Sequence, residues 1–273
     1  MNILILGSTG LIGNFLFQKF NYHQNFEIFS LSRKKFNRKN HFTFDVINNQ
    51  NMQMLNHYKF DIIFNCLGYN ANNDNVLKFY KKLAKKFLTP NAIWVEFGTL
   101  SSFKNKNLSS NFNLTNYGQN KIISENFIKN LSLINNFKLV ILKLGATCLK
   151  NDYNDFIYKK LNKIIYFNLF FNFYHDKHIF FKITFLEDIY HLCNKIINDR
   201  SINYSIIVYF RNFNPLVCLR KINVNLLIFK INFTLVSFIL KFLNKNLFIK
   251  FNNIFNFKIY DKETSGINYF IIK

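Results

Sequence analysis

A tyrosine and a lysine four residues apart, Tyr117 and Lys121, form the pair in this sequence whose chemistry is easiest to specify. In a helix, residues four apart lie on one face, one turn from each other. A neighbouring cation stabilises a phenolate and lowers the pKa of a phenol from about 10 toward the range of a general acid or base. The pair predicts proton transfer by Tyr117 with the help of Lys121.

Three glycines near the N-terminus, Gly7, Gly10 and Gly13, are spaced as in a loop that binds the phosphates of a dinucleotide. They separate an apolar run, Asn2–Leu6, from an amphipathic pattern, Leu11–Phe20, which predict a strand and a helix. The glycines allow a sharp turn, close approach of a pyrophosphate and close packing of the helix on the sheet. The helix N-terminus attracts phosphate through its N–H groups and its dipole. We therefore predict that the coenzyme binds to Gly7, Ser8, Thr9, Gly10, Leu11, Ile12 and Gly13.

The end of the second predicted strand indicates which coenzyme binds. A carboxylate at this place would bind the ribose hydroxyls of NAD, whereas an arginine accommodates the extra phosphate of NADP. This chain has Ser32 and Arg33 and no carboxylate there, which favours NADP over NAD. Asp45 and Val46, at the end of the third predicted strand, are expected to contact the adenine; the alternative is that Asp45 belongs to a solvated loop.

Apolar runs and amphipathic patterns alternate through the first half of the chain. Strands are expected at residues 2–6, 26–31, 42–46, 61–67, 92–97 and 138–144, and helices at 11–20, 75–87 and 117–129. Parallel strands need crossover connections, so this alternation predicts an α/β fold: a Rossmann-type doubly wound parallel sheet with helices on both faces. A helix at 186–197 and a strand at 205–210 follow. We expect an NAD(P)-binding Rossmann domain over 1–150 and, over 151–273, a small substrate-side lobe interleaved with the last strands of the sheet.

The composition argues against several other classes of protein. The net charge of +22 accompanies an excess of Phe, Asn, Ile and Lys, all encoded by A/T-rich codons, and forms no dense basic block. Nucleotide bias explains it better than binding of a nucleic acid. The four cysteines are far apart and show no metal-ligand spacing, so we expect no metal and a reducing compartment. No signal peptide is recognisable, which favours the cytoplasm.

One apolar stretch, residues 224–243, raises the question of a membrane span. Lys230, Asn232 and Lys241 interrupt it, whereas a clean span needs about 20 mostly apolar residues. We expect a buried or surface-lying helix, with membrane contact at most peripheral.

Several motifs in sequence order give the chain a resemblance to a known family. They are the glycine loop, Asp45, Asn65–Gly68, Asn75–Val76, Gly98–Thr99, the Tyr117/Lys121 pair and residues 185–189. Over about residues 1–150 the chain resembles the extended short-chain dehydrogenases/reductases, which include NAD-dependent nucleotide-sugar epimerases, dehydratases and dTDP-4-dehydrorhamnose reductase-like enzymes. The resemblance implies that Cys66, Leu67 and Gly68 contact the coenzyme, that Lys121 holds it, and that a hydroxyl orients the substrate oxygen. Thr99 is the first candidate for that hydroxyl and Ser101 the second; alternatively, these hydroxyls only cap a strand end.

The resemblance also implies a function. A cytoplasmic NAD(P)-dependent reductase or epimerase acting on a nucleotide-linked sugar is the leading hypothesis, and a homodimer is implied. Dehydration is disfavoured, because Leu100 and Ser101 occupy the positions at which the family's dehydratases carry an Asp-Glu pair. Without those carboxylates there is no obvious acid and base for the elimination of water. Lys143 and Gly145 replace the family's arginine–proline pair. The alternatives are a non-catalytic NAD(P)-binding scaffold and a membrane-peripheral accessory protein.

Overall fold

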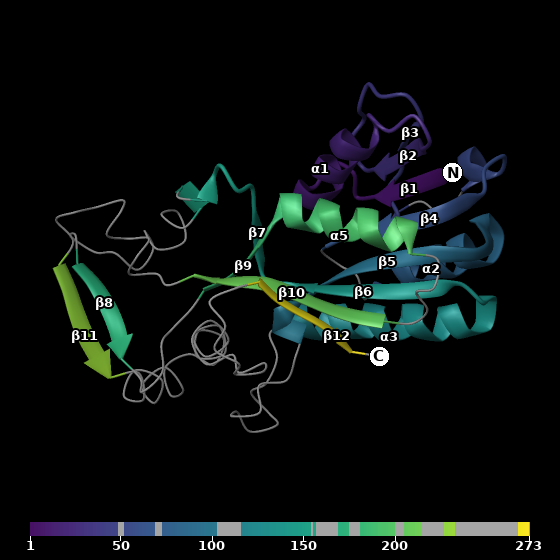
Figure 1. Ribbon diagram of the computed structural model, residues 1–273. Coiled ribbons are helices and arrows are strands. Elements are labelled where there is room, and N and C mark those ends of the chain that lie inside the picture. The colour runs from purple at the N-terminus through teal and green to yellow at the C-terminus, as the bar shows by residue number, and fades with distance from the viewer. Residues whose placement is uncertain are drawn as a thin grey trace.

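The computed structural model describes residues 1–48, 52–68, 73–102, 116–153, 155–156, 169–174, 181–199, 205–213, 227–232 and 267–272 (Figure 1). The helices are α1 (Leu11–Phe20), α2 (Asp74–Phe87), α3 (Asn116–Asn135) and α5 (Leu186–Asn198), with short 3-10 turns at Gln53–Leu55 and Leu100–Ser102. The first seven strands are β1 (Asn2–Leu6), β2 (Glu27–Ser32), β3 (His41–Thr43), β4 (Phe60–Asn65), β5 (Leu88–Thr99), β6 (Lys138–Leu144) and β7 (Ala146–Cys148). The others are β8 (Leu169–Tyr174), β9 (Phe181–Phe185), β10 (Ser205–Phe213), β11 (Leu227–Asn232) and β12 (Ile267–Ile272).

A ten-stranded sheet organises the molecule, in the order β3-β2-β1-β4-β5-β6-β10-β9-β7, with β12 paired to β10. Strands β1 to β6 and β10 run parallel, whereas β9 and β12 are antiparallel to β10. The chain moves outward from β1 to β3 and then returns to place β4 on the other side of β1, so the direction of winding reverses between β1 and β4. Such a reversal is where open α/β sheets bind ligands. The predicted Rossmann-type α/β fold is confirmed.

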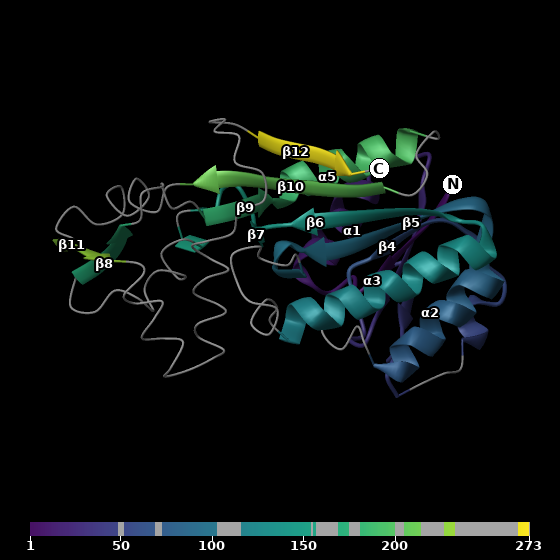
Figure 2. The ribbon, with the colours of Figure 1, turned by 90° about the horizontal axis from the view of Figure 1, so that it is seen from below.

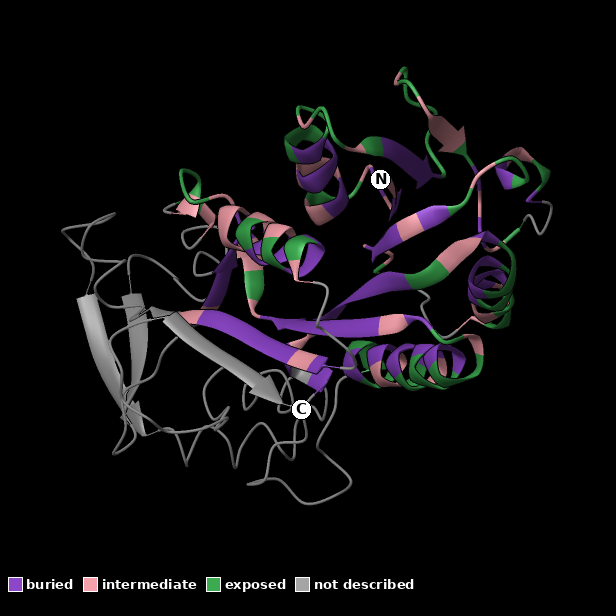
Figure 3. Ribbon diagram, turned by 45° about the vertical axis from the view of Figure 1, so that its right-hand side comes forward, coloured by how far each residue is buried: buried purple, intermediate pink, exposed green. Residues whose placement is uncertain are grey.

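The central strands are buried on both faces, which explains why they are nearly continuous runs of Ile, Leu, Val and Phe. Ile3, Leu4 and Ile5 of β1 have no exposed surface. Helices α1 and α5 cover one face of the sheet, and α2 and α3 cover the other (Figure 2). The burial pattern follows the same division, with the inner faces of the helices and the middle of each central strand buried (Figure 3).

The helices on the second face differ in what they bury. Helix α2 is amphipathic in the usual way: its Asn73 cap accepts a hydrogen bond from Asn75 N at 2.9 Å, and its buried positions are apolar or aromatic. Helix α3 instead buries Lys121, Ser124 and Glu125 among its apolar residues. Because a buried charge needs a partner, α3 indicates where polar groups converge.

Two expectations about elements were wrong. The third strand, expected at 42–46, ends at Thr43; Phe44 and Val46 enter the core by their side chains instead. Within the stretch 224–243 we expected a helix, but Leu227–Asn232 is strand β11, parallel to β8 in a separate two-stranded sheet. Its β-branched and aromatic residues, Ile228, Phe229 and Ile231, are compatible with a strand. The rest of that stretch lies outside the described residues. Across the described part of the chain, every helix is too short or too polar to cross a bilayer.

Candidate active site

The glycine turn, defined here as Gly7–Gly13, follows β1 at the point where the winding of the sheet reverses. Gly7 has φ +72°, which favours glycine, and its N–H donates to Leu31 O at 2.8 Å. A Cβ at Gly13 would lie 2.5 Å from Gly7 O, so only glycine allows α1 to begin this close to the turn. Gly10 is the N-cap of α1 and makes no side-chain capping hydrogen bond. The turn thus presents a helix N-terminus of the kind that binds phosphate.

Cys66 and Leu67, after β4, are the immediate neighbours of this turn. Cys66 N donates to Leu6 O at 3.0 Å, which continues the pairing of β1 with β4. A Cβ on Gly7 would lie 3.0 Å from Cys66 O and 3.3 Å from Leu67 N. Burial raises the pKa of the Cys66 thiol, so this side chain stays protonated rather than acting as a nucleophile. Gly68 follows on the exposed side of the same edge.

The four residues predicted to select the coenzyme and contact adenine are placed differently from one another. Ser32 is buried, and its hydroxyl donates to Lys34 O at 2.8 Å. Arg33 is exposed. The carboxylate of Asp45 accepts hydrogen bonds from Ile47 N at 3.0 Å and from Asn48 Nδ2 at 2.9 Å.

The hydrogen bond from Ile47 N is the largest of the causes that lower the pKa of Asp45. The Asp45 carboxylate therefore stabilises the turn in which it lies. Val46 points into the core beneath α2.

Arg38 is a cation beside the glycine turn that the sequence analysis did not select. Its guanidinium donates to Asn14 Oδ1 at 2.6 Å and to Ser8 O at 3.5 Å. The same group lies 4.2 Å from the ring centroid of Phe17 and 3.9 Å from that of Phe36. Stacking between aromatic rings orders a guanidinium. The sequence analysis did not single out Arg38 because, apart from Phe36, the groups that hold it (Phe17, Asn14 and Ser8) are brought to it by the fold.

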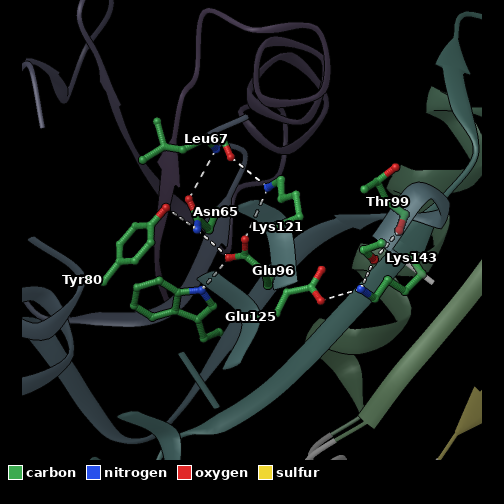
Figure 4. Close-up of polar contacts among 10 residues, drawn as sticks. Asn65, Leu67, Tyr80, Glu96, Thr99, Lys121, Glu125 and Lys143 are labelled. Carbon is green, nitrogen blue, oxygen red and sulfur yellow. Dashed lines mark hydrogen bonds and ion pairs between the residues drawn. The ribbon is translucent and has the colours of Figure 1, made fainter. Parts of the chain in front are cut away.

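Tyr117 and Lys121 occupy the first two turns of α3, as predicted. Tyr117, the second residue of the helix, has 41% of its surface exposed, whereas Lys121, one turn later, has 2%. The Lys121 ammonium donates to Leu67 O at 3.0 Å (Figure 4). Lys121 therefore reaches the residue that adjoins the glycine turn.

Glu96 is the carboxylate that accompanies Lys121, and it has no exposed surface. Its Oε1 lies 3.5 Å from Lys121 Nζ, and its Oε2 accepts hydrogen bonds from Asn65 Nδ2 and from Trp94 Nε1 (Figure 4). Burial raises the pKa of Glu96, while Lys121 and the Asn65 amide oppose that rise.

The backbone of Leu67, after β4, links Asn65 to Lys121 and so completes a ring of hydrogen bonds. Leu67 N donates to Asn65 Oδ1 at 3.3 Å, and Leu67 O accepts from Lys121. We name these four residues, Asn65, Leu67, Glu96 and Lys121, the Glu96 ring.

A second buried pair lies farther along α3, beside the end of β5. The Lys143 ammonium, from β6, donates to Glu125 Oε2 and to the hydroxyl of Ser102. Ser102 in turn donates to the carbonyl oxygen of Thr99 at 2.6 Å (Figure 4). Burial lowers the pKa of Lys143, against the opposing effect of Glu125. We name Ser102, Glu125 and Lys143 the Lys143 cluster.

The Lys143 cluster supports the backbone of Thr99, the first candidate for orienting the substrate. The side chain of the second candidate, Ser101, lies outside the described part of the chain. Residues 103–115 lie outside it as well. In the described residues no group of three or more His, Cys, Asp or Glu side chains is placed to hold a metal ion.

No protein-family model and no curated protein sequence matches this chain. Solved structures do resemble it. A dTDP-4-dehydrorhamnose reductase from Clostridium acetobutylicum superposes with a TM-score of 0.59 at 17% identity, over 85% of this chain and 84% of its own. A UDP-N-acetylglucosamine 4-epimerase from Bacillus cereus gives 0.62 at 12% identity, over 85% of each chain. A UDP-glucuronic acid 4-epimerase from Bacillus cereus, solved in complex with NAD, gives 0.63 at 14% identity, over 85% and 88%.

At these identities the likeness shows the fold, and it is the fold of the family that the motifs resemble. The glycine turn fits a dinucleotide on its own geometry, because a helix N-terminus follows a turn in which side chains are sterically excluded at Gly7 and Gly13.

Proposed function

We propose that this chain is an NAD(P)-dependent oxidoreductase or epimerase that acts on a nucleotide-linked sugar through Thr99, Tyr117 and Lys121. One observation carries the proposal. Leu67 adjoins the glycine turn, and its carbonyl oxygen accepts a hydrogen bond from the buried Lys121 ammonium at 3.0 Å. The phosphate-binding turn and the helix that bears the tyrosine–lysine pair therefore share one neighbour at the edge of the sheet where such folds bind ligands.

Each residue has a definite role in this proposal. A nicotinamide coenzyme, when bound, supplies or accepts the hydride exchanged with a sugar carbon. Tyr117 transfers the accompanying proton, and its 41% exposure leaves it accessible to a substrate. Lys121 supplies the positive charge that favours the phenolate and holds the ribose. Thr99 orients the reacting oxygen, with its backbone fixed by Ser102.

The proposed substrate class follows from the structural neighbours, which are nucleotide-sugar reductases and epimerases. Residues 1–150 would bind the coenzyme, and residues 151–273 would form the substrate-side lobe around the last strands of the sheet. A cytoplasmic homodimer completes the proposal.

NADP is the proposed coenzyme in preference to NAD. The end of β2 has no carboxylate to bind ribose hydroxyls, and two arginines follow it, Arg33 and Arg38. Arg38 is the better placed of the two, because its guanidinium is stacked and hydrogen-bonded beside the glycine turn. Arg33 is exposed.

Replacement of the proposed acid tests the catalytic assignment. Tyr117→Phe should bind NADPH as the wild type does, yet turn over a panel of UDP- and dTDP-linked hexoses and 4-keto-hexoses about 10²–10⁴-fold more slowly. Tyr22→Phe is the matched control, since Tyr22 is 84% exposed on the loop after α1 and belongs to no part of the site. Turnover is followed by NADPH absorbance and by product chromatography.

The outcomes separate the alternatives. Equal turnover in Tyr117→Phe and wild type would end the catalytic assignment. Coenzyme binding without turnover of any sugar would favour the non-catalytic scaffold. Salt-sensitive sedimentation with anionic liposomes, together with no coenzyme binding, would favour a membrane-peripheral accessory protein.

A further inference from the structure

The Glu96 ring holds a buried charge that the proposed chemistry does not by itself require. Glu96 lies near the carboxyl end of β5, with no exposed surface, and faces Lys121 on α3. Transfer of a carboxylate from water to such a place is unfavourable unless the charge is paired and hydrogen-bonded. Each of its two oxygens has such a partner, since Oε1 faces Lys121 and Oε2 accepts from Asn65 and Trp94.

This arrangement of donors is specific for a carboxylate. Donors approach Glu96 from both sides, so both of its terminal atoms must accept. A glutamine amide has one acceptor oxygen and one NH₂ group, and it would set a donor against either Lys121 or Asn65. The ring therefore depends on the charged residue rather than on a polar side chain of the same shape.

The ring also fixes where the Lys121 ammonium lies. An ammonium has three N–H groups, and Glu96 and Leu67 O use two of them within the described part of the chain. Asn65 accepts from Leu67 N at 3.3 Å, so the carbonyl that receives Lys121 is held by the same ring. The third N–H has no acceptor among the described residues.

We propose that Glu96 is a positioning residue, which holds the Lys121 ammonium at the edge of the glycine turn so that its third N–H donates to the ribose of the bound coenzyme. The inference rests on one part of the proposed function, the binding of a nicotinamide coenzyme, and does not depend on the identity of the sugar. It adds to the tyrosine–lysine pair a carboxylate that acts only through the lysine.

A double-mutant cycle on coenzyme binding tests this without any substrate. The dissociation constant for NADPH is measured by fluorescence titration for wild type, Glu96→Gln, Lys121→Met and the double variant. Each single variant should weaken binding about tenfold, the loss expected for one charge-assisted hydrogen bond. The double variant should bind like Lys121→Met, within about twofold, because Glu96 has no effect once the ammonium is gone.

Two further variants control for structural damage. Glu96→Asp keeps the charge and should bind NADPH within about threefold of wild type, whereas a purely steric role would weaken Glu96→Asp and leave Glu96→Gln, which has the same shape as glutamate, like wild type. Asp188→Asn removes the carboxylate of another ion pair, with Arg211 2.7 Å away, and should leave the dissociation constant unchanged. Urea unfolding establishes that each variant is folded.

Three results would overturn the inference. In the first, Glu96→Gln binds like wild type. In the second, Glu96→Gln weakens binding equally with and without Lys121, so that its effect does not pass through the lysine. In the third, the wild type fails to bind NADPH or NADH, which overturns the proposed function as well; in the first two, coenzyme binding stands and only the role of Glu96 is lost.

Discussion

The candidate site has two sides at the same edge of the sheet: the glycine turn and the start of helix α3. Different kinds of interaction stabilise the two sides. On the first side the contacts are made by the backbone: Gly7 N and Ser8 N both donate to Leu31 O, and α1 begins within contact of Gly7 O. On the second side four buried charges, in the Glu96 ring and the Lys143 cluster, make the contacts.

The difference shows how each side should respond to change. A backbone turn has no charge to lose, but it is intolerant of added atoms where the chain packs against itself. A buried ion pair tolerates changes of shape better than the loss of one charge, because the charge that remains is left without its partner.

Breaking the Lys143 cluster should give the largest loss of stability. Glu125→Gln leaves the Lys143 ammonium buried without a counter-ion, which should lower the free energy of unfolding by about 3–5 kcal/mol. The double replacement Glu125→Met/Lys143→Met removes both charges and should be as stable as the wild type or more so by up to about 4 kcal/mol. Urea unfolding followed by circular dichroism measures both. A single variant as stable as the double one would show that the pair is not a unit.

Adding one methyl group to the glycine turn should have a smaller effect on stability. Gly13→Ala places a Cβ 2.5 Å from Gly7 O, and the necessary shift of α1 should cost about 1–3 kcal/mol. Gly68→Ala is the matched control, because a Cβ there would meet nothing within 4 Å. The same unfolding experiment compares them. If both variants lose equal stability, tight backbone packing is not what holds this side.

The smallest expected effect distinguishes the two arginines near the glycine turn. Arg38→Ala should weaken NADPH binding about tenfold, or about 1.4 kcal/mol, and leave NADH binding nearly unchanged, because only NADPH carries the extra phosphate. Arg33→Ala, which removes an exposed cation of the same loop, should have little effect on either. Fluorescence titration provides all four constants. Equal losses for NADPH and NADH would remove Arg38 as a determinant of coenzyme preference.

Much of the fold could be predicted from the sequence because its elements have local signals. The predicted bounds of β1, α1 and β6 match the structure, since each is a clear apolar run or an amphipathic pattern. Strand β11 was missed because a short apolar run fits a strand or a helix equally well. Its pairing with β8, more than fifty residues earlier, is a long-range property.

The sequence by itself determined the glycine turn and the position of Tyr117 and Lys121 on one helix, because spacing along the chain fixes both. Only the tertiary structure decided what surrounds them. Asn65 and Glu96 are 31 residues apart, and Leu67 and Lys121 are 54 apart, so no local pattern links them. In the sequence, Glu96 is a single charged residue within an apolar strand, and its hydrogen-bond donors become apparent only in the folded chain. The free energy of a buried charge depends on its neighbours in space rather than in sequence.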